Sequence, residues 1–88
     1  MSLASIEAAL PPEPTEIDAL SFRVRLGRRI RAERALRNWT QGDLADASGM
    51  HRSYVSSVER GERNVGVENL VLIASAFGLT LSELLTNL

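Results

Sequence analysis

The polar side chains best suited to chemistry in this chain lie close together, in residues 52–60. An arginine can form two parallel hydrogen bonds to guanine or to a phosphate, and a serine hydroxyl can donate or accept one. Positions one, four and five residues apart share a face of a helix. Helical spacing therefore directs Val55 and Val58 inward. The four side chains that it directs outward are Arg52, Ser53, Ser56 and Ser57.

The sequence contains no pattern typical of a catalytic or metal site. It has no cysteine and a single histidine, His51, and no glycine-rich loop that would hold a phosphate group. Glu59 and His51 are eight residues apart, about 12 Å along one helix, which is too far for joint acid–base chemistry. We therefore expect a protein that is not an enzyme and that uses no metal and no cofactor.

Two short helices joined by a tight turn must position this polar face. Thr40, with Asp43 three residues later, approximates a capping box and predicts a helix that runs to about Ser48. Gly49 ends that helix, because glycine adopts the left-handed conformation without steric cost. A further helix is expected over residues 52–60.

The spacing of small and apolar residues indicates that these two helices cross at a steep angle. Ala45 is small enough to let the second helix approach, Gly49 supplies the turn, and Val55 packs on the Ala45 side. Leu44 and Val58 point into the same core. This pattern predicts a helix-turn-helix.

Three more helices are expected, over residues 22–37, over residues 67–77 and from Thr80 onward. Phe22, Leu26 and Ile30 form the apolar stripe of the first. No alternating pattern or hairpin turn indicates a strand. The fold class is therefore all-α, with five helices in residues 22–88.

Residues 1–21 are expected to form a separate N-terminal arm. They contain three closely spaced prolines and four acidic residues but no basic one, so the arm has a charge of −4. A tail without structure and a short docked helix over residues 3–10 are both compatible with this pattern. The remaining chain has ten arginines and seven acidic residues, and a modestly basic body with an acidic arm fits nucleic-acid binding better than the net charge of −1 suggests. All ten basic residues are arginine and none is lysine, which suits paired hydrogen bonds to phosphate or guanine but is also compatible with a biased base composition of the genome.

The chain resembles the XRE family, the lambda-repressor-like helix-turn-helix proteins that include phage repressors, Cro proteins and restriction-modification controllers. The resemblance covers residues 26–85. It rests on four segments at suitable mutual distances: LGRRIRAER at 26–34, WTQGDLADASG at 39–49, HRSYVSSVERGERN at 51–64 and VENLVLIASAFGLTLSELL at 67–85. Val65, Gly66 and Asp43 depart from the usual proline, serine and glutamate of the family. The resemblance implies a five-helix DNA-binding domain, with the helix at 52–60 in the major groove.

The resemblance also implies roles for individual residues. The residues expected to read bases are Arg52, Ser53, Ser56 and Ser57. Arg52 could instead contact a phosphate, and each serine could instead only face solvent. The residues expected to contact phosphates are Gln41, His51, Tyr54, Arg60, Arg63 and Asn64; packing over the helix is the other interpretation of Tyr54. Arg34 and Glu59 are expected to form a buried ion pair that fixes the angle of the recognition helix.

A homodimer is expected, because one small helix-turn-helix contacts few base pairs. Its interface is predicted to contain Leu79, Leu81, Leu85 and Leu88, although these leucines could instead only close the core of the monomer. The predicted function is that of a bacterial, cytoplasmic transcriptional regulator that is associated with the nucleoid when bound to an inverted-repeat operator in double-stranded DNA. The alternatives are a DNA-binding antitoxin and a protein-interaction module with the same fold, for which the N-terminal arm could bind a protein partner. No membrane association is expected.

Overall fold

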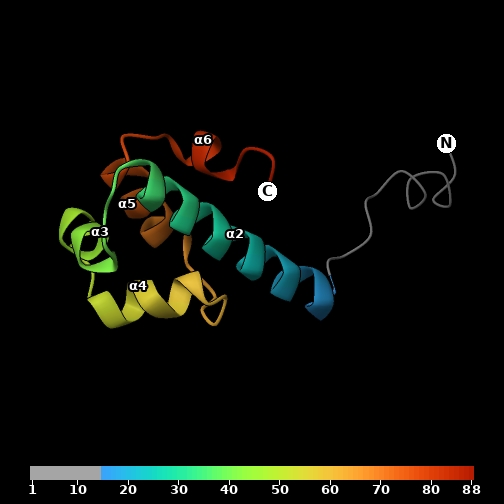
Figure 1. Cartoon of the computed structure of the whole chain (residues 1–88). Helices are drawn as coiled ribbons and strands as arrows, with labels where there is room; N and C mark the ends of the chain where they lie inside the picture. The colour runs from blue at the N-terminus through green and yellow to red at the C-terminus, as the bar shows by residue number, and fades with distance from the viewer. Residues whose placement is uncertain (1–14) are drawn as a thin grey trace, which may run out of the picture.

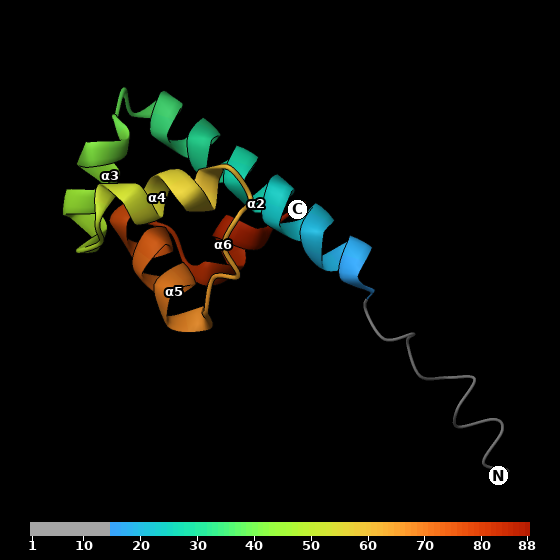
Figure 2. The same ribbon diagram turned by 90° about the horizontal axis from the view of Figure 1, so that it is seen from below.

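The computed structural model describes residues 15–88, and the predicted short helix at residues 3–10 lies outside them. The longest helix, α2 (Glu16–Leu36), runs across the molecule, and its N-terminal turns extend beyond the other helices (Figures 1 and 2). The prediction placed the start of this helix at Phe22, six residues too late. Thr15 and Asp18 form a capping box that starts it earlier: Thr15 Oγ1 accepts the Asp18 N–H at 3.1 Å, and the Asp18 carboxylate accepts the Thr15 N–H at 3.0 Å.

The helix-turn-helix consists of α3 (Gln41–Ser48) and α4 (Arg52–Glu59). Thr40 and Asp43 form the predicted capping box at the start of α3. Gly49 ends α3 with φ of 71°, the left-handed conformation that favours glycine, and redirects the chain into α4. Both helices therefore begin and end within one residue of the predicted positions.

The C-terminal part of the chain forms α5 (Val67–Ala76) and the short α6 (Leu81–Leu85). Thr80 and Glu83 cap α6 as predicted. Residues 15–88 contain five helices and no strand, which confirms the all-α fold class. None of these five helices combines the length and the apolar composition needed to cross a membrane.

A single apolar core joins the five helices. All five contribute fully or nearly fully buried side chains: Leu26, Ile30, Leu44, Ala45, Val55, Val58, Leu70, Ile73, Ala74, Phe77 and Leu84, with Phe77 from the end of α5. α4 packs on both α2 and α3, while α5 packs on α3 and α6. The position of α4 is therefore fixed by contacts with two other helices.

The approach of α2 to α4 depends on Gly27. This glycine is buried, and a Cβ atom added to it would lie 2.8 Å from the carbonyl carbon of Glu59 and 2.9 Å from the carbonyl oxygen of Val58. Because those are backbone atoms, they cannot move aside as a flexible side chain would. Gly27 thus lets the two helix backbones meet at the C-terminal end of α4.

Several arginines of α2 bind the backbone of other parts of the fold. Arg29 donates to the carbonyl oxygens of Glu83 and Thr86, at 3.0 and 2.8 Å. Arg25 donates to the carbonyl oxygen of Leu88 at 2.5 Å. These bonds satisfy carbonyl groups in and after α6 and hold the C-terminal segment on α2.

Candidate nucleic-acid interface

An open groove on the outer side of the helix-turn-helix brings together one residue of α3 and three of α4. Its lining residues are Gln41, Arg52, Ser53 and Ser56. Arg52 and Ser53 are exposed, while Gln41 and Ser56 are half-buried. In residues 15–88 the Arg52 guanidinium takes part in no ion pair. The groove therefore presents hydrogen-bonding groups at the N-terminal end of α4, where a helix also favours negative charge.

The Glu59 carboxylate holds α4 against α2. Arg34 donates from Nε to Oε2 at 2.5 Å and from Nη2 to Oε1 at 2.7 Å, so the pair is bidentate. The Glu59 side chain is fully buried, and the Arg34 side chain is 15% exposed. Arg34 also donates to the carbonyl oxygen of Trp39 at 2.8 Å. The ion pair that the resemblance implied is thus present in the structure. Through its bond to Trp39, Arg34 also connects this pair to the segment before α3.

Glu59 also reaches the groove through Gln41. Gln41 Nε2 donates to Glu59 Oε1 at 3.2 Å, which fixes the side chain of Gln41 relative to α4. Burial raises the pKa of Glu59, but the hydrogen bonds from Arg34 and Gln41 and the charges of Arg34 and Arg31 outweigh it, so the pKa lies below its ordinary value. The carboxylate remains ionised and keeps accepting these bonds.

Ser57 does not lie on the outward face, so its predicted outward position is wrong. It is only 6% exposed. Its Oγ donates to the carbonyl oxygen of Tyr54 at 2.7 Å and accepts from Arg63 Nε at 3.1 Å. The helical periodicity could not show this, because the loop after α4 covers that side of the helix.

Tyr54 packs against its surroundings more than it faces outward. It is half-buried, its hydroxyl accepts from Asn69 Nδ2 at 3.1 Å, and the Arg63 guanidinium lies over its ring at 5.5 Å from the ring centre. His51, by contrast, is exposed at the N-cap of α4, and its side chain makes no capping hydrogen bond. His51 therefore remains accessible beside Arg52, whereas Tyr54 offers little free surface.

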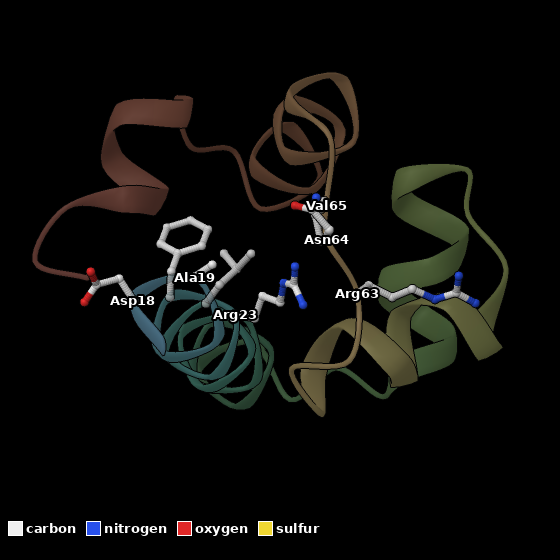
Figure 3. A pocket seen from close by; sticks show the side chains of 8 residues that line it. Asp18, Ala19, Arg23, Arg63, Asn64 and Val65 are labelled. Atoms are coloured by element: carbon white, nitrogen blue, oxygen red, sulfur yellow. The ribbon is translucent and has the colours of Figure 1, made fainter. Parts of the chain in front are cut away.

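The predicted phosphate contacts after α4 differ in accessibility. Arg60 forms a bidentate ion pair with Glu62 at 2.9 and 3.1 Å and also donates to Ser56 Oγ. The hydrogen bond with Arg60 lowers the pKa of Glu62. Arg63 and Asn64 are exposed and both line a cavity of about 250 Å³ against α2, with the Arg63 side chain extending away from Asp18 and Ala19 of α2 (Figure 3). The Glu62 carboxylate is thus paired with the guanidinium of Arg60, whereas the guanidinium of Arg63 remains accessible.

Several contributors to this site were not identified from the sequence. Gly27 is one, although an isolated glycine inside a helical pattern is a known signal of close packing. Arg31, 61% exposed and 3.7 Å from Glu59 Oε1, adds positive charge beside the recognition helix. The pairing of Arg60 with Glu62 could not be predicted, because it depends on the conformation of the loop. Within the described residues, no group of three or more potential metal ligands is present.

The part of the chain that contains this groove is similar to known proteins. The helix-turn-helix family HTH_3 matches residues 30–84. The control protein C.SmaI of Serratia marcescens is 43% identical over 61 residues, which cover 69% of this chain and 73% of that protein. The control protein C.BamHI of Bacillus amyloliquefaciens is 36% identical over 66 residues, 74% of this chain and 82% of that protein.

Solved structures agree with these sequence matches. The restriction-modification controller protein C.AhdI from Aeromonas hydrophila superimposes with a TM-score of 0.70 and is 41% identical. The match covers 73% of this chain and 97% of that one. The region that the family matches, residues 30–84, contains the last seven residues of α2 and all of α3, α4 and α5, and so includes the four residues that line the groove. The chain therefore belongs to the helix-turn-helix family HTH_3, a family of DNA-binding transcriptional regulators of the XRE type.

Proposed function

We propose that this regulator binds an inverted-repeat DNA operator as a homodimer, with α4 of each protomer in the major groove. The observation that carries the proposal is the groove at the N-terminal end of α4, where Arg52 and Ser53 are exposed beside Gln41. The similarity to restriction-modification controllers supports a role in controlling transcription. We place the protein in the bacterial cytoplasm, at the nucleoid, because its proposed ligand is chromosomal DNA.

Arg52 is the main base-reading residue in this proposal. Its guanidinium is exposed and can bind a guanine with two hydrogen bonds, a contact that contributes about 1–3 kcal/mol of discrimination. Ser53 and Ser56 can each add one weaker hydrogen bond to a base. Ser57 is omitted, because it is buried.

Phosphate contacts set the position of the helix on the duplex. We assign them to Gln41, which Glu59 holds beside α4, and to the exposed side chains near both ends of α4: His51, Arg63 and Asn64. Arg60 joins this set only when it leaves Glu62. Tyr54 is assigned to packing and not to the phosphate backbone.

The proposed dimer interface uses the C-terminal leucines. Leu79, Leu81, Leu85 and Leu88 are half-buried and pack against the core, so they also complete the fold of each protomer. Their outer surfaces, with the exposed Val71 and Leu72 of α5, are the apolar area that we propose a second copy covers. Two protomers then present two α4 helices to successive turns of the same DNA face.

Selection from a random duplex library tests this function. We expect the unaltered protein to enrich an inverted repeat, and Arg52→Ala to enrich a repeat that has lost its preference at particular positions. Arg63→Ala is the matched control: it also removes one exposed arginine, but it should weaken binding evenly across sequences. No enrichment with the unaltered protein would refute the proposal, and loss of all binding by both variants would refute the division between bases and phosphates.

A further inference from the structure

Arg63 is held in place by two residues of the recognition helix. Its Nε donates to Ser57 Oγ at 3.1 Å, and its guanidinium carbon lies 5.5 Å from the centre of the Tyr54 ring. Tyr54 is in turn fixed by Asn69 of α5, whose Nδ2 donates to the phenolic oxygen at 3.1 Å. The side chain of Arg63, in the exposed loop after α4, is thus held by two residues of α4.

The Ser57 hydroxyl has its only proton committed to this arrangement. It donates its proton to the carbonyl oxygen of Tyr54 and accepts from Arg63, and its side chain is buried. It can therefore not reach a base or a phosphate itself. Only Nε of Arg63 is bound to it, and in residues 15–88 neither terminal nitrogen of Arg63 takes part in an ion pair.

We infer that Ser57 is a positioning residue. In the free protein it holds the Arg63 guanidinium in the position from which this group contacts a DNA phosphate. An arginine loses side-chain freedom when it binds, and a side chain that is already ordered loses less. These two terminal nitrogens, which form no ion pair within residues 15–88, match the paired oxygens of a phosphate group. This inference rests on the proposed function, since it assigns a part of the same interface.

Ser48 provides a matched control within the chain. It is 7% exposed, close to the 6% of Ser57, and its Oγ donates to the carbonyl oxygen of Leu44 at 2.7 Å, the same kind of bond to its own helix. No arginine donates to it among the hydrogen bonds of residues 15–88. Ser48→Ala and Ser57→Ala therefore remove equivalent helix contacts, and only the second releases Arg63.

A double-mutant cycle on DNA binding tests the inference, with the duplex selected from the random library as probe. We expect Ser57→Ala to weaken binding about two- to tenfold, the range expected when one side chain must be ordered on binding. In the Arg63→Ala background, Ser57→Ala should cause no further loss. Ser48→Ala should leave affinity unchanged in both backgrounds.

Salt dependence separates positioning from direct contact. Each phosphate contact contributes about 0.9 to the slope of log K against log salt concentration. Arg63→Ala should reduce the slope by about this amount, whereas Ser57→Ala should leave it unchanged. Equal losses in Ser48→Ala and Ser57→Ala, additivity of the cycle, or a reduced slope in Ser57→Ala would each overturn the inference.

The Arg63 contact can also be measured without DNA. In NMR spectra of the free protein, Ser57→Ala should shift the Nε–Hε resonance of Arg63, and Ser48→Ala should not. An unchanged resonance in Ser57→Ala would overturn this inference and leave the proposed function standing. Failure of the unaltered protein to bind any selected duplex would overturn the proposed function, and the role of Arg63 with it, even if the resonance shifts.

Discussion

The buried side chain of Glu59 connects three helices of the fold. Its buried carboxylate accepts from Arg34 of α2 and from Gln41 of α3, while its own backbone belongs to α4. A buried ion pair contributes little net stability compared with a well-packed apolar pair, because both charges lose their hydration. Its effect on the fold is to determine orientation, since the two bonds from Arg34 fix the position of α4 on α2.

Removal of the Glu59 charge should therefore destabilise the protein strongly. We expect Glu59→Gln to lower the free energy of unfolding by about 3–5 kcal/mol, because the Arg34 guanidinium, 15% exposed, is left without a counter-charge. Urea denaturation measures this change. Glu68→Gln, at an exposed position on α5, is the control and should change stability by less than about 0.5 kcal/mol. Similar midpoints for the two variants would contradict the structural role of Glu59.

The same carboxylate makes stability depend on pH in the acid range. The pKa of Glu59 is lowered from 4.5 in the folded protein, because the bonds from Arg34 and Gln41 outweigh the effect of burial. The stabilisation is therefore present above about pH 4.5 and is lost as the pH falls through the lower, folded value. The stability of the unaltered protein should decrease below pH 4.5. Glu59→Gln should show a weaker decrease, due to groups such as Glu33, whose pKa is also lowered. Parallel curves for the two proteins would exclude this contribution.

Glu62 limits the positive charge available for DNA, because it occupies the Arg60 guanidinium. Both side chains are more than half exposed, so the pair contributes little stability. We expect Glu62→Gln to raise affinity for DNA several-fold at low salt, with a smaller gain at high salt. Fluorescence anisotropy on a labelled duplex measures this. Glu16→Gln, at the exposed start of α2, removes the same charge outside both proposed interfaces and should have little effect. Equal gains in both variants would show that only the net charge matters.

At the scale of elements, local signals determined what could be predicted. The helices α3 and α6 begin where a threonine is followed three residues later by an acidic residue, and the prediction recognised both. The same signal at Thr15 and Asp18 starts α2, but the prolines before it favour an arm that continues to residue 21, so the predicted start of the helix is too late. A proline before the N-cap is compatible with a helix that starts immediately afterwards, so these prolines mark the boundary and not the absence of a helix.

The crossing of α2 and α4 provides a test at this scale. We expect Gly27→Ala to destabilise the protein by about 1–3 kcal/mol and to weaken DNA binding, because the new methyl group forces α4 away from α2. Gly42→Ala in α3 is the matched control, since the nearest atom to its added Cβ is Thr40 Oγ1 at 3.6 Å. It should stabilise the protein by about 0.5–1 kcal/mol. Thermal denaturation of both variants decides the matter, and a neutral Gly27→Ala would contradict the close contact.

At the scale of the whole molecule, contacts between distant segments determined what the sequence could not predict. The outward positions of Arg52 and Ser53 follow from helical periodicity and agree with the structure. Ser57 follows the same periodicity but is buried, because Arg63 folds back over it from the loop. Arg25 and Arg29 of α2 likewise bind carbonyl groups some 60 residues later in the chain, and such contacts have no local signal in the sequence. The local sequence pattern therefore predicts the recognition helix, but the contacts that the loop after it makes can be seen only in the structure.

The proposed symmetry of the assembly can be tested on the DNA alone. In a rigid dimer the two α4 helices contact half-sites about one DNA turn apart, roughly 34–36 Å. An insertion of five base pairs between the half-sites turns one of them to the opposite face of the duplex. We expect the affinity of the unaltered protein for the operator with the insertion to fall. It should equal the affinity for the control, an operator in which one half-site is replaced by unrelated sequence. Sedimentation should find two chains on the intact operator. Unchanged affinity after the insertion would show that the protomers bind independently, and it would refute the homodimer while leaving the recognition helix in place.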